Sequence, residues 1–161
     1  MSRLSASSGT VAEAAHYFPV RVYYADTDAG GVVYHATYLD FAERARTEFL
    51  RSLGVPHHEL MAGEGLVFVV RAAHVEYQRP ARLDDSLTVV SRIVALGGAS
   101  VTLGQDVMRG AETMATLRIR LVATDLSEGR ARRIPRRWRA AFAALLVAEE
   151  GGGETPARKE S

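Results

Sequence analysis

Residues 22–54 read VYYADTDAGGVVYHATYLDFAERARTEFLRSLG, a turn-forming segment followed by one long amphipathic stretch. From Ala36 to Leu53 the apolar residues recur every three or four positions, and most charged residues fall on the opposite side. Gly54 stands where a glycine commonly ends a helix. The pattern predicts a helix of about five turns whose apolar stripe must pack against another surface.

Strand-like runs lie on both sides of this expected helix. Pro19–Ala25 precedes it and is rich in β-branched and aromatic residues. The four runs that follow are Leu66–Tyr77, Ser86–Leu96, Ser100–Met108 and Thr113–Thr124, with hairpin turns expected at Gly97-Gly98 and Arg109-Gly110 and short helices expected over 56–63 and 136–147. One long helix cannot supply the crossovers that several parallel strands need. The order predicts an α+β domain, a curved five-stranded antiparallel sheet wrapped around one long central helix.

The composition is that of one globular domain, with 161 residues of which 47% are hydrophobic and 24% charged. A formal net charge of +1 does not favour nucleic acid as a partner, and the lack of cysteine excludes disulfides, zinc–thiolate sites and a cysteine nucleophile. We expect a flexible leader over 1–16, without the features of a secretory signal, the folded domain over 17–148, and a disordered tail over 149–161. No run approaches the roughly 20 apolar residues of a membrane span, so a cytoplasmic protein is expected.

The segment between the first strand and the helix carries groups suited to chemistry. Asp26-Thr27-Asp28 is followed by Gly30-Gly31, and then by His35 at the helix entrance. The first turn of a helix presents backbone N–H groups without internal partners, and such donors bind an oxyanion. A nearby carboxylate serves as a nucleophile or as a general base on water, so these parts suit acyl transfer to water. Asp and Gly are also ordinary turn formers, in which case His35 merely flanks the helix.

The run Val22–Leu50 closely resembles the hotdog-fold acyl-CoA thioesterases, most of all the 4-hydroxybenzoyl-CoA-thioesterase-like branch associated with the bacterial Tol-Pal gene cluster. The likeness continues in FVVR at Phe68–Arg71, VEY at Val75–Tyr77 and PARLDD at Pro80–Asp85. It implies hydrolysis of acyl-CoA, or of acyl carrier protein thioesters, to free acid and thiol, without a metal or other cofactor. It also implies a homodimer or homotetramer with the site between two protomers, in agreement with an open sheet edge that a second copy would cover.

The resemblance assigns roles to individual residues. Asp28 matches the essential aspartate of the family, as nucleophile or general base, and His35 matches the histidine that orients water or the carboxylate, or assists the departing thiolate. Tyr24 matches the aromatic residue before the acid pair. It would position Asp28 through its hydroxyl, or else be a plain core aromatic on a strand. A backbone N–H near His35 would meet the thioester carbonyl. The remaining substrate-binding residues are expected to be Gly31, Val32, Tyr34 and Arg71.

Other polar groups leave alternatives open. The arginines between 130 and 139 suit the phosphates of CoA, RNA or an anionic membrane face, but also a merely solvated surface; they are Arg130, Arg132, Arg133, Arg136, Arg137 and Arg139. Another branch of the fold carries its catalytic carboxylate on the long helix, where this chain has Asp40, Glu43 and Glu48. Glu43 and Arg46 are expected to pair on the polar side of that helix. No histidine pair has the spacing of metal ligands, so no metal site is expected.

Two other functions compete with a thioesterase. A hydratase or dehydratase of acyl-CoA would use the same fold, but the chain carries no companion motif for it. A non-catalytic acyl-thioester-binding or scaffold protein associated with the cell envelope is the alternative from another class. The presence of both Asp28 and His35 favours the enzyme.

Overall fold

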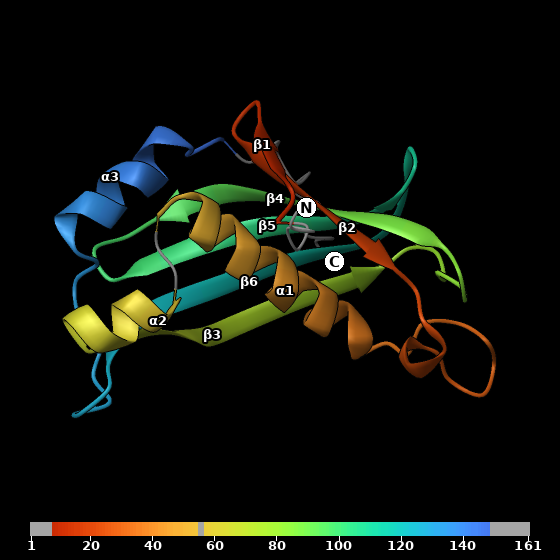
Figure 1. Cartoon of the computed structure of the whole chain (residues 1–161), viewed down its shortest axis with the longest axis horizontal. Helices are drawn as coiled ribbons and strands as arrows, with labels where there is room; N and C mark the ends of the chain where they lie inside the picture. Colours follow the sequence, from red (N-terminus) through yellow and green to blue (C-terminus); the bar gives the residue numbers. More distant parts are fainter. Residues whose placement is uncertain (1–7, 55–56, 149–161) are drawn as a thin grey trace, which may run out of the picture.

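The computed structural model describes residues 8–54 and 57–148 (Figure 1). Its six-stranded sheet has the order β1-β2-β4-β5-β6-β3, and every neighbouring pair is antiparallel. The strands are β1 (Thr10–Ala12), β2 (Ala15–Arg21), β3 (Leu66–Tyr77), β4 (Ser86–Leu96), β5 (Ser100–Arg109) and β6 (Glu112–Asp125). The predicted antiparallel sheet is confirmed, with one strand more than the expected five.

The long helix α1 (Thr37–Ser52) lies across one face of the sheet, as its periodicity predicts (Figure 1). Phe41 and Phe49 are fully buried in the core that α1 forms with β2, β4 and β5. Gly54 follows the helix with a φ of 77°, a left-handed conformation that a glycine adopts without strain. The shorter helical elements are η1 (Tyr24–Asp26), α2 (His57–Glu59), η2 (Leu60–Glu64) and α3 (Arg136–Ala144).

The prediction of a flexible leader over residues 1–16 is partly wrong, because strand β1 and the start of β2 lie inside this range. A two-residue turn joins them, with positive φ at both Glu13 (50°) and Ala14 (61°). Such a turn usually carries Asn or Gly at these positions, so the residues Glu-Ala give no hairpin signal. Residues 1–7 of the expected leader and the tail expected over 149–161 lie outside the described residues.

The first predicted strand is displaced along the chain. The sequence predicts an extended strand over Pro19–Ala25, but β2 ends at Arg21 and Tyr24 begins the 3-10 helix η1. The cause is local, because the carboxylate of Asp26 accepts a hydrogen bond from the Tyr23 amide at 2.8 Å and so stabilises a turn instead of a strand. This turn starts the loop that leads to α1.

His16 joins the N-terminal strands to the long helix from a fully buried position on β2. Its ring stacks on Phe49 of α1 with centroids 5.3 Å apart, and its Nε2 donates to the Ser8 carbonyl at 2.7 Å. Its Nδ1 has no hydrogen-bond partner within the described part of the chain. Burial lowers the pKa of His16 below its usual 6.5, although the nearby Glu48 carboxylate favours the charged form.

We expect the protein to lose stability as the pH falls below about 6.5, because the unfolded chain then binds a proton that the buried His16 resists. Each unit by which folding lowers this pKa corresponds to about 1.4 kcal/mol of unfolding free energy lost at acid pH. Urea unfolding of the His16→Gln variant between pH 7.5 and 5.0 should show a weaker pH dependence than the parent chain. The exposed His58 supplies a matched control, His58→Gln, and equal pH profiles for His16→Gln and the parent would contradict the prediction.

Candidate active site

The loop before α1 folds into a tight turn around Asp28. The Gly30 amide donates to Asp28 Oδ1 at 2.8 Å, and the Gly31 amide donates to the Asp28 carbonyl at 3.0 Å. Gly31 has a φ of 77°, which explains the glycine at this position. Asp28 itself is solvent-exposed, so its carboxylate is accessible to a substrate.

The N-terminus of α1 keeps free hydrogen-bond donors. The Thr37 amide donates to Tyr34 and the Leu39 amide to Ala36, but the amides of Ala36 and Tyr38 have no acceptor within residues 8–54 and 57–148. Ala36 is the capping residue and offers no side-chain acceptor. Two backbone donors therefore remain available at the positive end of the helix dipole, an arrangement that binds oxyanions.

A cavity of about 250 Å³ lies beside this helix start. Its walls come from the segment before α1, from α1 and from the end of β3, through Val33, His35, Tyr38, Tyr77, Gln78, Arg79 and Pro80. The Tyr77 hydroxyl donates to the His35 carbonyl at 2.7 Å and so ties β3 to the helix entrance. The Tyr38 hydroxyl accepts from the Ala81 amide, and burial raises the pKa of Tyr38, which keeps this phenol neutral. The cavity thus has two tyrosines and a histidine in its walls, and one of them, Tyr38, has an amide without an acceptor among the described residues.

The structure brings only some of the predicted site residues together. His35 lines the cavity and Tyr34 contacts its ring at 4.4 Å between centroids, whereas Asp28 is not among the lining residues. Val32 forms an isolated bridge with Arg82, outside the cavity walls, and Arg71 lies exposed at an irregularity of β3. Within one chain, the predicted nucleophile and the histidine make no hydrogen bond with each other.

The structure contradicts one of the two predictions made for Tyr24. It is 82% exposed and lies in η1, so the reading as a core aromatic on a strand is wrong. Among the described residues its hydroxyl makes no hydrogen bond with Asp28. The positioning role stays a prediction, and one that a second protomer against the loop would have to support.

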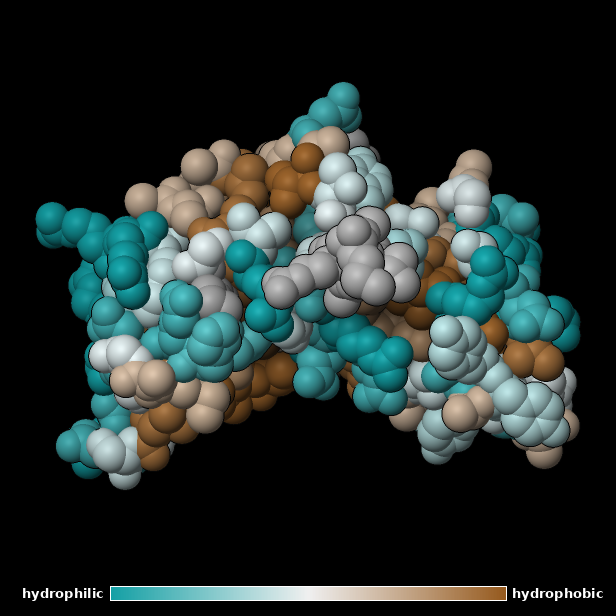
Figure 2. All heavy atoms as spheres, in the orientation of Figure 1, coloured by the Kyte–Doolittle hydropathy of each residue, from teal (hydrophilic) through white to brown (hydrophobic). Residues whose placement is uncertain are grey.

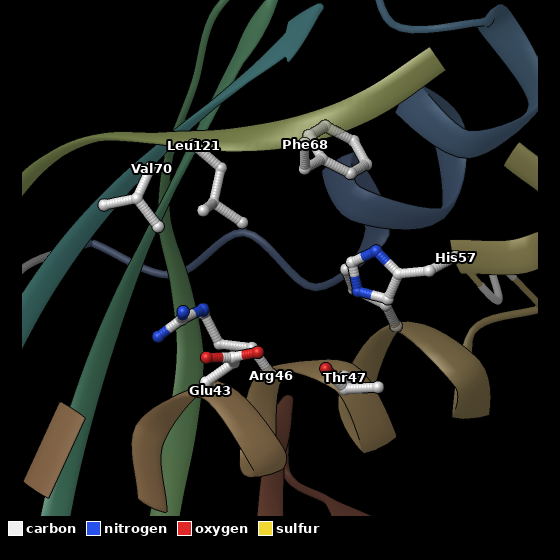
Figure 3. Close-up of a pocket in the computed structure, with 8 residues that line it drawn as sticks. Glu43, Arg46, Thr47, His57, Phe68, Val70 and Leu121 are labelled. Atoms are coloured by element: carbon white, nitrogen blue, oxygen red, sulfur yellow. The ribbon is translucent and has the colours of Figure 1, made fainter. Parts of the chain in front are cut away.

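A second cavity, of about 240 Å³, opens between α1, α2 and β3 (Figure 3). Arg46 lines it and is only 8% exposed, so its expected place on the polar side of the helix is wrong, although the Glu43 carboxylate still favours its charged form. Instead, Arg46 donates to Gln105 Oε1 at 3.1 Å, and Gln105 Nε2 donates to the Ala42 carbonyl and to Ser91 Oγ, each at 2.9 Å. Burial lowers the pKa of Arg46. This network holds α1 on β4 and β5.

Sequence reasoning did not single out Tyr77 or Gln105. Tyr77 stands in the VEY motif, but its hydrogen bond to a residue 42 positions away has no local sequence signal. Gln105 is the one polar residue among the alternate positions 101, 103, 105 and 107 of β5, where the others are Val, Leu and Val, and such a position is a signal of a buried polar contact. The described residues contain no cluster of three or more His, Cys, Asp or Glu side chains placed to hold a metal ion.

Known proteins share both the sequence and the fold. Residues 22–142 match the family model described as the thioesterase-like superfamily. A Haemophilus influenzae protein named acyl-CoA thioesterase YbgC is 42% identical over 125 residues, which cover 78% of this chain and 92% of the relative. An Escherichia coli O6:H1 protein named acyl-CoA thioester hydrolase YbgC is 52% identical over 97 residues, covering 60% of this chain and 72% of the relative. The crystal structure of a probable thioesterase from Bartonella henselae superposes with a TM-score of 0.72 at 44% identity, covering 75% of this chain and 99% of that one.

Proposed function

This chain belongs to the thioesterase-like superfamily and is an acyl-CoA thioesterase, and we propose that Asp28 and the N-terminus of α1 carry its chemistry. The observation that supports the proposal most is the pair of amides at Ala36 and Tyr38, which lack an acceptor among the described residues and follow the exposed Asp28 by eight and ten positions. The antiparallel sheet across α1 is the hotdog fold of the superfamily.

In the proposed reaction, the thioester carbonyl oxygen lies against the free amides of the helix start. Asp28 either attacks the carbonyl carbon, so that the C–S bond breaks and water hydrolyses the resulting anhydride, or takes a proton from a water that attacks instead. In both routes the negative charge that develops on the carbonyl oxygen is stabilised by the amides and the helix dipole. His35 orients the water or gives a proton to the departing thiolate.

Thiol release from acyl-CoAs of graded chain length tests this function directly. We expect hydrolysis of at least one acyl-CoA. Acyl carrier protein thioesters, measured as a second set of substrates, show whether the enzyme also accepts acyl groups on that carrier. Binding of acyl-CoA without release of thiol would instead favour the non-catalytic binding protein.

We further propose that two copies pair through β3 to complete the site. β3 is an edge of the sheet, and Val69 and Val70 on it are 37% and 47% exposed. An exposed apolar edge strand is a template for pairing with another chain. A dimer through β3 would also bring a second protomer towards the cavity beside Tyr77, which within one chain is not lined by Asp28. We propose the pairing of two such dimers into a tetramer from the resemblance to the hotdog-fold thioesterases alone.

A lysine on this edge is expected to separate the copies. In Val69→Lys the charged side chain would be repelled by the same lysine of the second copy or lose its water in the interface. Sedimentation equilibrium should therefore report a shift towards monomer. Val11→Lys on β1, the opposite sheet edge, is the matched control because Val11 is 40% exposed. Dissociation by Val11→Lys alone would place the interface at the other edge.

The Tyr77→Phe variant is expected to lower kcat about fivefold while KM stays within about twofold. Loss of one hydrogen bond costs about 1 kcal/mol, and the bond holds the helix entrance whose donors act mainly on the transition state. Tyr17→Phe removes the same oxygen from a tyrosine on β2 and should leave both constants unchanged. A rise in KM alone in Tyr77→Phe would assign the residue to substrate binding.

The cellular setting rests on the resemblance alone. Within residues 8–54 and 57–148, no helix has the length and apolar character to cross a bilayer. We propose a cytoplasmic enzyme associated with the Tol-Pal system, as the branch that the motif Val22–Leu50 resembles suggests.

A further inference from the structure

A group of arginines surrounds a hollow where β6 leads into α3. The hollow has a volume of about 450 Å³, and its walls are Glu64, Arg132, Arg133, Ile134, Pro135, Arg136 and Arg139. Four arginines and one glutamate thus contribute to its walls. In Figure 1, α3 and α2 lie at one end of the molecule and the loop that carries Asp28 at the other, and hydrophilic side chains gather at the α3 end in Figure 2.

The backbone beneath these arginines is held firmly. The Ile134 amide donates to the Gly98 carbonyl at 2.9 Å, and the Arg132 amide donates to the Ala123 carbonyl at 2.9 Å. Trp138 and Phe142 anchor α3 in the core, with Phe142 against Phe68 at 6.1 Å between ring centroids. The guanidinium groups therefore project from a fixed base, as a binding site requires.

The positive charge in the hollow is only partly compensated. Arg132 pairs with Asp125 at 2.9 Å, and Glu64 lies 3.9 Å from Arg137. Arg133, Arg136 and Arg139 form no ion pair with any acidic residue in the described part of the chain. The first turn of α3 contains no acidic residue and its N-terminus has no side-chain cap, so the helix dipole adds to the positive field. Like charges gathered in this way repel one another unless an anion lies between them.

Phosphate is the anion that this arrangement fits best. The planar fork of arginine donates two parallel hydrogen bonds to phosphate oxygens, and arginine is preferred over lysine where such recognition matters. The hollow accommodates one head group and not a polymer, and the formal net charge of +1 argues against a nucleic acid. We propose that Arg132, Arg133, Arg136 and Arg139 form a binding site for a phosphate group, carried by a small soluble molecule or by a phospholipid. The site does not depend on the chemistry assigned to Asp28.

Two binding measurements on the full chain distinguish these sources. Calorimetry with inorganic pyrophosphate tests a soluble phosphate, and co-sedimentation with phosphatidylglycerol vesicles, against phosphatidylcholine vesicles, tests a lipid head group. We expect saturable binding in at least one arm, and at least about tenfold weaker binding in Arg133→Gln/Arg136→Gln, which loses two exposed charge-assisted donors. Arg44→Gln/Arg120→Gln removes equal charge from exposed arginines elsewhere and should bind like the parent.

Binding of pyrophosphate alone would identify a soluble ligand, and binding of the anionic vesicles alone a lipid surface. The proposal is overturned if neither probe binds or if both double variants weaken binding equally. It is also overturned if sodium chloride, added to the same ionic strength in every sample, abolishes the difference in affinity between the two double variants. Thiol release by the same variants is measured in parallel, so that a failure of this site is separated from a failure of the catalytic assignment.

Discussion

Asp28→Asn is expected to lower kcat for acyl-CoA hydrolysis by about 10²–10⁴-fold, the range for loss of a positioned catalytic acid–base group. The amide cannot take a proton from water and is a poor nucleophile, so both proposed routes fail. It still accepts a hydrogen bond, so the contact from the Gly30 amide, and with it the turn, is retained. Initial rates of thiol release at a series of acyl-CoA concentrations give kcat and KM.

Asp26→Asn is the matched control two residues away. Its side chain still accepts from the Tyr23 amide, so η1 is kept and kcat should change by no more than a few-fold. Undiminished activity in Asp28→Asn would sink the assignment. Glu43→Gln would then be the next variant to measure, because Glu43 is a carboxylate of α1 that lines the second cavity.

Gln105→Leu is expected to destabilise the folded chain by about 3–5 kcal/mol. The change removes the acceptor of the buried Arg46 and the donor to both Ala42 and Ser91, which leaves a buried charge without its hydrogen-bond partner. Urea unfolding gives the free energy. Gln78→Leu, at an exposed glutamine, should change it by no more than about 0.5 kcal/mol.

The double variant Arg46→Met/Gln105→Leu separates the charge from the packing. Replacing both partners by apolar groups removes the uncompensated guanidinium, so the double variant should be more stable than Gln105→Leu alone by about 1 kcal/mol or more. Equal stability of the two would show that Arg46 reaches water or the Glu43 carboxylate when Gln105 is lost.

Elements with a strong local pattern could be predicted. The periodicity of residues 36–53 gives α1, and the runs expected at 66–77 and 86–96 coincide with β3 and β4. In these segments the burial of a residue follows from its place in a repeating pattern. The β1–β2 hairpin could not be predicted, because Glu13 and Ala14 adopt positive φ without the residue types that favour it.

The sequence by itself determined the elements of the active-site loop, because Asp28, Gly31, His35 and the start of α1 are close neighbours along the chain. Only the tertiary structure decided which groups surround that loop. The bond from Tyr77 to His35 spans 42 positions and that from Arg46 to Gln105 spans 59, and neither follows from local periodicity. The arginines between 130 and 139 show the same division. Their number is plain in the sequence, but whether they line one hollow depends on how α3 packs against the sheet, since long-range packing decides which side chains of a charged run converge.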